Sequence, residues 1–231
     1  MSAAKMLPPA DVDVFVFDVC DTLFYSNTTF DYLNYVLEQK QLGGRRRWLQ
    51  LLTKRWSPAY LGLAVWQKLA GGDAIKAAAL RLLVGIPKEE LYALGRSFLK
   101  DFLGTRKIAR THELLASSVG SRTRVVLISA SLDPIIAALA VALEVEFVSS
   151  ELDYDGRGRC TGRLRREMSG QKHHALRELA GADLRLAVAT DNFTDRALVA
   201  GAAYRYVVVH RPADKPFWQD LGPQFIEAYS A

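Results

Sequence analysis

Short apolar segments rich in β-branched residues alternate with helical patterns along most of this chain. The segments lie at residues 11–17, 124–128, 146–148, 184–189 and 204–209, and helical patterns lie at 133–143, 171–180 and 194–200. Parallel strands need long crossover connections, which are usually helices. The alternation therefore predicts an α/β fold in which a parallel sheet carries helices on both faces.

Residues 27–105 interrupt this alternation because they contain no convincing strand. Helical patterns are expected at residues 30–41, 45–56, 59–69, 74–83 and 88–102, and Gly-Gly and X-Pro pairs separate them. The sequence therefore predicts two domains. An α/β core would comprise residues 1–26 and 106–231, and an all-helical domain at 27–105 would be inserted after the first strand.

The composition is that of a folded globular protein, since 50% of the 231 residues are hydrophobic and 24% are charged. Cys20 and Cys160 are too far apart in the sequence for zinc-ligand spacing, and two cysteines make no disulfide framework. The N-terminal segment has no apolar stretch typical of a secretory signal, and the longest apolar run, 135–143, is too short to span a bilayer. We expect a cytoplasmic protein.

The positive charge of the chain is concentrated in the predicted helical domain. The formal net charge is +5, and residues 27–105 hold 12 Lys and Arg against 6 Asp and Glu. The remaining residues hold 18 against 19, so this one segment accounts for the excess. Such a segment favours an anionic partner of one of three kinds, a phosphate ester, an anionic lipid surface or a nucleic acid.

Polar residues follow the predicted strands at the edge where ligands bind in open parallel sheets. They are Asp18, Cys20, Asp21 and Thr22 after the first strand, Ser129, Ala130 and Ser131 after the second, and Thr190, Asp191, Asn192 and Asp195 after the fourth. Any one of them is readily explained as a helix cap or turn residue. Four carboxylates at one edge favour a Mg²⁺ site instead, because the ion would relieve their repulsion.

These residues carry a resemblance to a known family. The sequence resembles the haloacid dehalogenase-like hydrolase superfamily, in its phosphoserine-phosphatase-like branch (subfamily IB). Four motifs occur in the family's order, namely Asp18-Val19-Cys20-Asp21-Thr22, the strand ending at Ser129, Lys172 at the start of a helix, and Asp191 followed by Asp195. The resemblance implies a Rossmann-like core and identifies the helical insertion with the family's C1 cap.

The resemblance also implies a role for each matching residue. Asp18 would attack phosphorus and form an aspartyl-phosphate. Mg²⁺ would be bound by Asp18, the backbone carbonyl of Cys20 and Asp191, with Asp195 as a further ligand or the holder of a metal-bound water. Ser129, Ala130 and Lys172 would bind the phosphoryl group of a small phosphorylated substrate, and Arg166 is a further candidate for substrate phosphate.

One residue departs from the family pattern. Phosphatases of the family have a second Asp two positions after the nucleophile, which protonates the leaving group and then activates water. Cys20 stands there, and a thiol is a poor substitute for that carboxyl. Asp21, where the family usually has Gly, is an alternative proton donor, but it also fits the part of a turn residue or of a hydrogen-bonding neighbour.

Three functions remain open at this point. The first is a Mg²⁺-dependent phosphatase with activity weakened by Cys20. The second is a metal-independent dehalogenase-like C–X hydrolase, because such enzymes also lack the second Asp. The third is a non-catalytic relative that binds a phosphorylated ligand or a partner protein.

The predicted cap combines basic residues with tryptophans. Trp48 and Trp56 are separated by about two helical turns, three arginines precede Trp48, and the following segment 59–66 is apolar. Such a pattern is compatible with binding to an anionic lipid surface at the inner face of a membrane, or with an ordinary solvated basic face. The sequence shows no nucleic-acid-binding module, so we expect no nucleic acid partner. It does not predict an oligomeric state.

Overall fold

The computed structural model describes residues 9, 11–54, 56–63, 73–119, 121, 123–181 and 184–229. Its strands form one seven-stranded sheet in the order β4-β3-β2-β1-β5-β6-β7. The strands are β1 (Val14–Phe17), β2 (Arg124–Leu132), β3 (Glu146–Tyr154), β4 (Cys160–Arg166), β5 (Leu186–Thr190), β6 (Tyr204–Val209) and β7 (Gln224–Glu227). Every neighbouring pair is parallel except β3 and β4, which form an antiparallel hairpin. The predicted α/β class with a mostly parallel sheet is confirmed.

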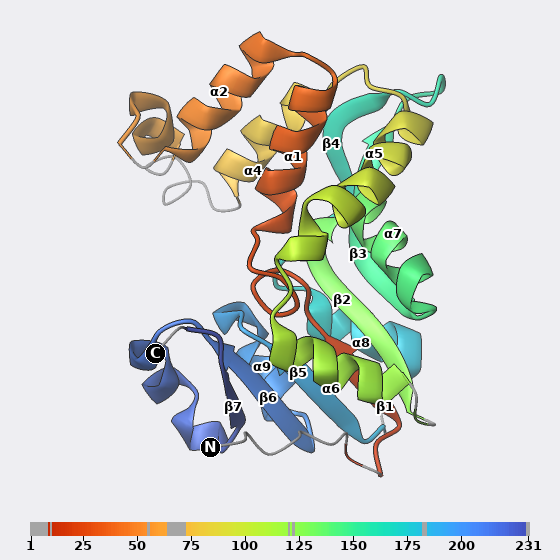
Figure 1. The fold of residues 1–231 in the computed structure, drawn as a ribbon, viewed down its shortest axis with the longest axis vertical. Coiled ribbons are helices and arrows are strands. Elements are labelled where there is room, and N and C mark those ends of the chain that lie inside the picture. The colour runs from red at the N-terminus through yellow and green to blue at the C-terminus, as the bar shows by residue number, and fades with distance from the viewer. Residues whose placement is uncertain are drawn as a thin grey trace.

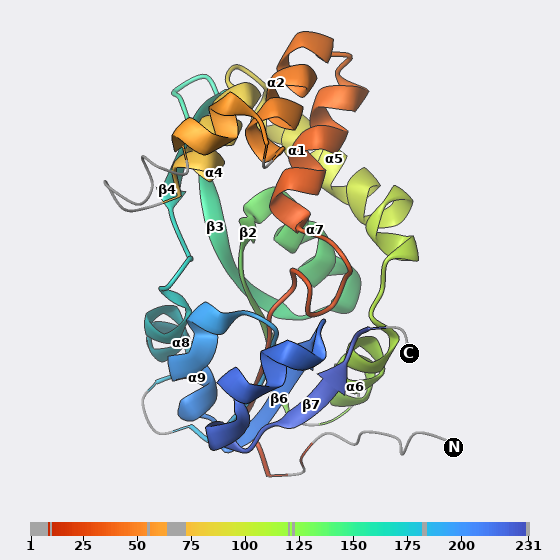
Figure 2. The same cartoon turned by 90° about the vertical axis from the view of Figure 1, so that its left-hand side faces the viewer.

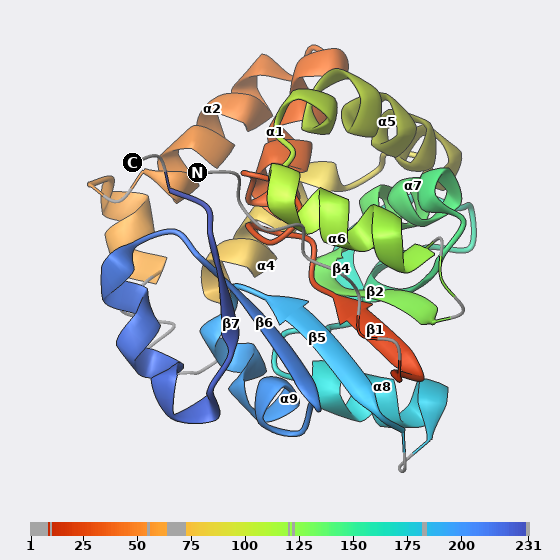
Figure 3. The same cartoon turned by 60° about the horizontal axis from the view of Figure 1, so that its bottom comes forward.

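Helices cover both faces of the sheet, as predicted (Figure 3). On one face, Phe15 and Phe17 of β1 pack in the same core as α6 (Ala109–Val119) and α7 (Asp133–Leu143). On the other face, Val14 and Val16 share a core with α8 (Lys172–Ala180) and α9 (Arg196–Ala200). Alternate residues of β1 thus serve opposite cores, which is why its sequence is continuously apolar.

A helical segment lies between β1 and β2, and we call residues 27–105 the helical insert. Its helices are α1 (Thr28–Gln39), α2 (Gly43–Thr53), α4 (Ala74–Leu80) and α5 (Lys88–Asp101), and residues 58–63 are also helical. The rest of the helix predicted at 59–69 lies outside the described residues. Figures 1 and 2 show the insert on one side of the molecule, above the sheet. This arrangement is consistent with the C1 cap that the resemblance implied.

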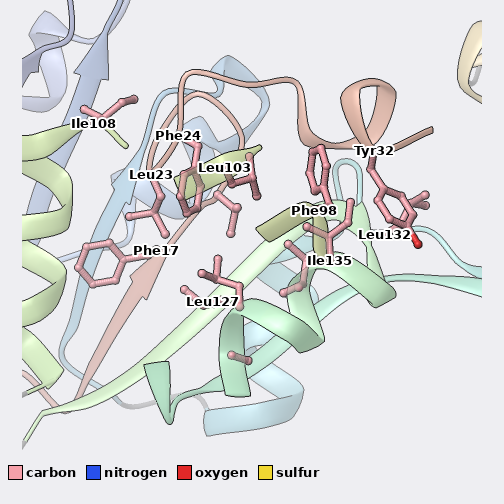
Figure 4. Close-up of a cluster of buried hydrophobic side chains, with 14 of the residues drawn as sticks. Phe17, Leu23, Phe24, Tyr32, Phe98, Leu103, Ile108, Leu127, Leu132 and Ile135 are labelled. Atoms are coloured by element: carbon pink, nitrogen blue, oxygen red, sulfur yellow. The ribbon is translucent and has the colours of Figure 1, made fainter. Parts of the chain in front are cut away.

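The helical insert shares a buried core with the sheet. Tyr32 of α1 packs edge-on against Phe98 of α5, with ring centroids 5.6 Å apart. Figure 4 shows these two rings beside Leu132 and Ile135, which belong to β2 and α7. The four side chains are fully buried, so apolar contact holds the insert against the sheet.

Two glycines allow the insert to approach the core closely. A Cβ atom at Gly95 of α5 would lie 2.2 Å from the backbone oxygen of Pro134, which opens α7. Gly162 of β4 has a φ of +74°, and a Cβ there would lie 2.6 Å from a methyl group of Val84. Any larger residue at either position would push the insert away from the sheet.

The structure also corrects the predicted strands. The third segment was expected to contain three residues, but β3 contains nine and continues into the hairpin with β4. The short edge strand β7 was not predicted. Among the helices of the described residues, none is both long and apolar enough to cross a membrane.

Candidate active site

The carboxyl end of β1 positions the candidate nucleophile. The backbone N–H of Asp18 donates to the carbonyl of Ala189 at 2.9 Å, which continues the β1–β5 ladder past the end of the strand. The N–H of Val19 donates to Oδ1 of Asp18 at 2.8 Å and fixes the orientation of the carboxylate. The Asp18 side chain is therefore held at the edge of the sheet with little freedom.

A buried lysine lies between two carboxylates. Lys172 Nζ lies 2.8 Å from Oδ2 of Asp18 and 2.7 Å from Oδ2 of Asp195. All three residues are at most 4% exposed. Burial alone would lower the pKa of Lys172, but the charges of Asp18 and Asp195 outweigh burial and raise it, so the ammonium stays charged. Burial raises the pKa of Asp18, and the positive charge of Lys172 opposes that shift.

The position of Asp195 makes it a support for Lys172. Its Oδ2 accepts hydrogen bonds from Lys172 and from the hydroxyl of Thr190, which is 2.7 Å away. Asp195 Oδ2 thus already accepts hydrogen bonds from two protein donors. Asp195 does not line the pocket around Asp18.

Asp191 faces the same site from the carboxyl end of β5. Thr22 Oγ1 donates to Oδ1 of Asp191 at 2.9 Å, and the N–H of Asp191 donates back to Thr22 Oγ1 at 2.9 Å. Burial and then the charge of Asp18 raise the pKa of Asp191 well above its usual value. The charge of Asp18 thus acts on Asp191, and of these two carboxylates only Asp18 is paired with a lysine.

The carboxylates share one pocket of about 270 Å³. Residues of the core and of the helical insert line it, namely Asp18, Cys20, Asp21, Asn27, Thr29, Phe30, Asp73, Lys76, Ser129, Ala130, Ser169, Lys172, Asp191, Asn192 and Phe193. Most of the residues singled out from the sequence thus meet at one place. A volume of this size suits a small polar molecule rather than a polymer.

The donor set of this pocket fits a magnesium ion. Within the described ranges, no group of three His, Cys, Asp or Glu side chains is arranged to hold a metal. Mg²⁺ does not need such a cage, because proteins usually bind it through one or two carboxylates, with water and substrate phosphate completing the shell. Asp18 and Asp191 provide two carboxylates; burial raises the pKa of both, and the charge of Asp18 further raises the pKa of Asp191.

Cys20 is turned toward hydroxyl groups. Its Sγ lies 2.8 Å from Thr28 Oγ1 and 3.1 Å from Ser131 Oγ. Burial, and then the charge of Asp18, raise the pKa of the Cys20 thiol. The group therefore stays protonated near neutral pH and does not supply the acid and base chemistry of a carboxyl.

Asp21 occupies a backbone conformation that favours glycine. Its φ is +46°, and Asp tolerates this left-handed region better than most residues. Its carbonyl oxygen lies 2.6 Å from Nε2 of His210, which follows β6. Burial raises the pKa of the Asp21 carboxyl, and His210 partly opposes the shift. A glycine would adopt this left-handed conformation without strain.

Lys76 of α4 is a site residue that no sequence motif indicated. It is 6% exposed, and its Nζ donates to the carbonyl of Ala130 at 2.9 Å and to both oxygens of Glu167 at 3.0 Å. The side chain therefore joins the helical insert to the end of β2 at the wall of the pocket. In the sequence it stands in an ordinary helical pattern, so no spacing rule distinguishes it.

The structure places Arg166, which was expected to contact substrate phosphate, outside the pocket around Asp18. Its guanidinium pairs with Glu178 at 3.1 Å, and both side chains are exposed. It lines a larger cleft of about 720 Å³ beside β3 and β4, together with Lys88, Tyr92 and Asp133. That cleft shares no residue with the pocket around Asp18.

Comparison with known proteins establishes the family. The haloacid dehalogenase-like hydrolase family model matches residues 15–199, which include Asp18, Ser129, Lys172 and Asp191. The chain therefore belongs to the haloacid dehalogenase-like hydrolase family. None of the curated proteins that were compared matches it.

Solved structures share the fold at low sequence identity. A protein of unknown function from Bordetella pertussis Tohama I has a TM-score of 0.77 and 19% identity, over 94% of this chain and 99% of that one. A probable phosphoserine phosphatase from Vibrio cholerae has a TM-score of 0.64 and 14% identity, over 96% of this chain and 62% of that one. A substrate-bound phosphoserine phosphatase has a TM-score of 0.54 and 12% identity, over 94% and 93%. These likenesses show a common architecture.

Proposed function

We propose that this chain is a Mg²⁺-dependent phosphatase that hydrolyses a small phosphomonoester through an aspartyl-phosphate on Asp18. The observation that carries the proposal is the buried Asp18 carboxylate, paired with Lys172 and facing Asp191 across one small pocket. The family membership and the fold shared with phosphoserine phosphatases support it. In this proposal, residues 27–105 form the cap and residues 1–26 and 106–231 form the catalytic core.

The reaction has two displacements at phosphorus. In the first, a carboxylate oxygen of Asp18 forms a bond to phosphorus while the bond to the substrate oxygen breaks, which leaves an acyl phosphate. In the second, water attacks phosphorus and releases inorganic phosphate and the Asp18 carboxylate. Lys172 and Ser129 would hold the phosphoryl oxygens, and Asp18 and Asp191 would bind Mg²⁺ with the Cys20 carbonyl. The ion would neutralise charge on the transferring group.

Proton transfer to the leaving group is the weak point of this active site. The Cys20 thiol is held by two hydroxyl groups and has a raised pKa, so it is a poor acid. Asp21 lines the same pocket, and its raised pKa favours a protonated carboxyl that could donate to the leaving oxygen. We therefore propose Asp21 as the proton donor, with turnover that is fast only for good leaving groups.

The loss of the second Asp also favours an alternative, a non-catalytic protein that binds a phosphorylated ligand. Hydrolysis of p-nitrophenyl phosphate and acetyl phosphate, with Mg²⁺ and with EDTA, separates the two. The phosphatase requires Mg²⁺-dependent turnover that Asp18→Asn abolishes and that the exposed control Asp101→Asn leaves unchanged. Binding of phosphate without turnover would favour the alternative, and chloride release from 2-chloropropionate without metal would favour a C–X hydrolase.

A further inference from the structure

The helical insert exposes several large apolar side chains on α2, on the turn that follows it and in the helical residues 58–63. We call this region the distal surface, and it consists of Arg47, Trp48, Leu51, Lys54, Trp56 and Leu61. Trp56 is 94% exposed, Trp48 58%, Leu61 53% and Leu51 43%. Leu49 and Leu52 of the same helix are buried, so α2 is apolar on its inner face and partly apolar on its outer face. Figure 1 shows α2 at the end of the insert away from the sheet.

The segment that carries this surface has charged residues of one sign. Residues 39–72 contain seven Lys and Arg and no Asp or Glu. Two of the arginines have partners, since Arg46 pairs with Glu38 at 2.8 Å and Arg45 donates to the carbonyls of Leu82 and Val84. Arg47 and Lys54 are exposed, and no acidic group in the described part of the chain lies within 4 Å of either cation. Their charges are therefore available to an anionic partner.

We infer that the distal surface binds the surface of an anionic lipid membrane. Tryptophan prefers the membrane interface because its ring is apolar and its indole N–H remains hydrogen-bonded. Arg47 and Lys54 flank the exposed rings and would contact lipid phosphate, as the cations of interfacial helices do. No side chain of the pocket around Asp18 belongs to this surface, so the inference does not rest on the proposed phosphatase activity.

Other partners fit these observations less well. A protein interface buries apolar side chains but is depleted in lysine, whereas the distal surface mixes Lys54 with tryptophans. A nucleic acid would need a longer row of free cations, because its affinity comes mainly from phosphate contacts. A lipid surface uses both components at once, apolar insertion and charge attraction.

Co-sedimentation of the full chain with vesicles tests the inference. The vesicles are phosphatidylcholine alone, or phosphatidylcholine with about 30% phosphatidylglycerol. Each is used at low and at high salt, because salt screens the attraction between exposed cations and anionic lipid. We expect pelleting with the anionic vesicles at low salt, and much less with the neutral vesicles or at high salt. Absence of pelleting at low salt with anionic vesicles would overturn the inference.

Paired variants assign the binding to the surface. Arg47→Gln with Lys54→Gln should lower the vesicle partition coefficient about 30-fold, since each cation near an anionic surface contributes about fivefold. Trp48→Ala with Trp56→Ala should lower it at least about tenfold. The controls are Arg96→Gln with Lys100→Gln, which remove two exposed cations from α5, and Phe147→Ala, which removes an exposed ring from β3.

The controls should bind vesicles like the unchanged protein, and circular dichroism should show that every variant is folded. Equal losses in the α5 control would mean non-specific charge attraction and would overturn the inference. Concentration-dependent dimers that Trp48→Ala with Trp56→Ala abolishes, without any vesicle binding, would assign the surface to a second copy of the chain instead.

Discussion

The ammonium group of Lys172 lies 2.8 Å from a carboxylate oxygen of Asp18, and both side chains are almost completely buried. The lysine comes from the first position of α8 and the aspartate from the residue after β1, so two distant parts of the chain form the pair. A buried charge that loses its partner is strongly destabilising, because desolvation is no longer offset.

Replacement of Lys172 should therefore affect stability as well as activity. We expect Lys172→Met to lower the free energy of unfolding by about 3–5 kcal/mol, because Asp18 and Asp195 remain buried without a cation. Asp18→Asn combined with Lys172→Met should be less destabilised than Lys172→Met alone. Urea unfolding of the four proteins of this cycle measures the coupling, and Lys100→Met on the exposed face of α5 serves as control. Additive effects would show that Asp18 and Lys172 do not interact.

Asp191 and Asp195 should differ in their effect on metal binding. Asp195 holds Lys172, whereas Asp191 lines the pocket beside Asp18. We expect Asp191→Asn to raise the Mg²⁺ concentration needed for half-maximal activity by about tenfold or more. Asp195→Asn should lower kcat but leave that concentration within about twofold, because the residue acts on the lysine. The same Mg²⁺ requirement in both variants would make Asp195 a metal ligand.

Cys20→Asp should restore an acid and base at the position where family phosphatases carry one. General acid catalysis typically contributes about 10²–10⁴-fold, so turnover of an alkyl phosphate should rise by about 10²-fold or more. Turnover of p-nitrophenyl phosphate should rise much less, because its leaving group needs little protonation. Cys20→Ser keeps a hydrogen-bonding group among the hydroxyls of Thr28 and Ser131 and is the matched control. A loss of activity toward both substrates in Cys20→Asp would contradict this expectation.

His112 should make the stability of the protein depend on pH in the acidic range. Burial, and then the charge of Lys107, lower the pKa of His112 from 6.5 to about 4. The unfolded chain therefore binds the proton more tightly, and stability falls as the pH decreases from about 6.5 toward 4. With allowance for partial exposure, we expect a loss of about 1–2 kcal/mol.

Urea unfolding at pH 7 and pH 5 measures this contribution. The difference between the two values should be smaller in His112→Leu than in the unchanged protein, because the buried imidazole no longer titrates. His174 is exposed on α8 and its replacement by Gln is the control. An unchanged pH dependence in His112→Leu would assign the effect to other groups.

Much of the fold follows from local sequence patterns. The runs that became β2, β5 and β6 were apolar enough to be identified, and the residues after them form the pocket. The length of β3 was missed because its second half, Ser150–Tyr154, is polar and gains its order from the antiparallel partner β4. Pairing partners of this kind do not appear in a hydrophobic pattern.

The side-chain partners within the site were harder to predict. The resemblance implied that Asp195 would serve a metal site, and only the structure shows that its carboxylate holds Lys172. No local pattern around Arg166 revealed its pairing with Glu178, and nothing marked Lys76 as a buried residue at the pocket wall. Each of these contacts joins residues that are brought together only by the tertiary fold, so no local sequence spacing predicts it.

The most direct test of the central claim is the detection of the covalent intermediate. The protein is mixed with acetyl phosphate and Mg²⁺, quenched in acid within the first turnover, digested and analysed by mass spectrometry. We predict one phosphoryl group on the peptide that contains Asp18, absent with EDTA and absent in Asp18→Asn. Turnover that continues in Asp18→Asn, or a phosphoryl group on another residue, would contradict the account.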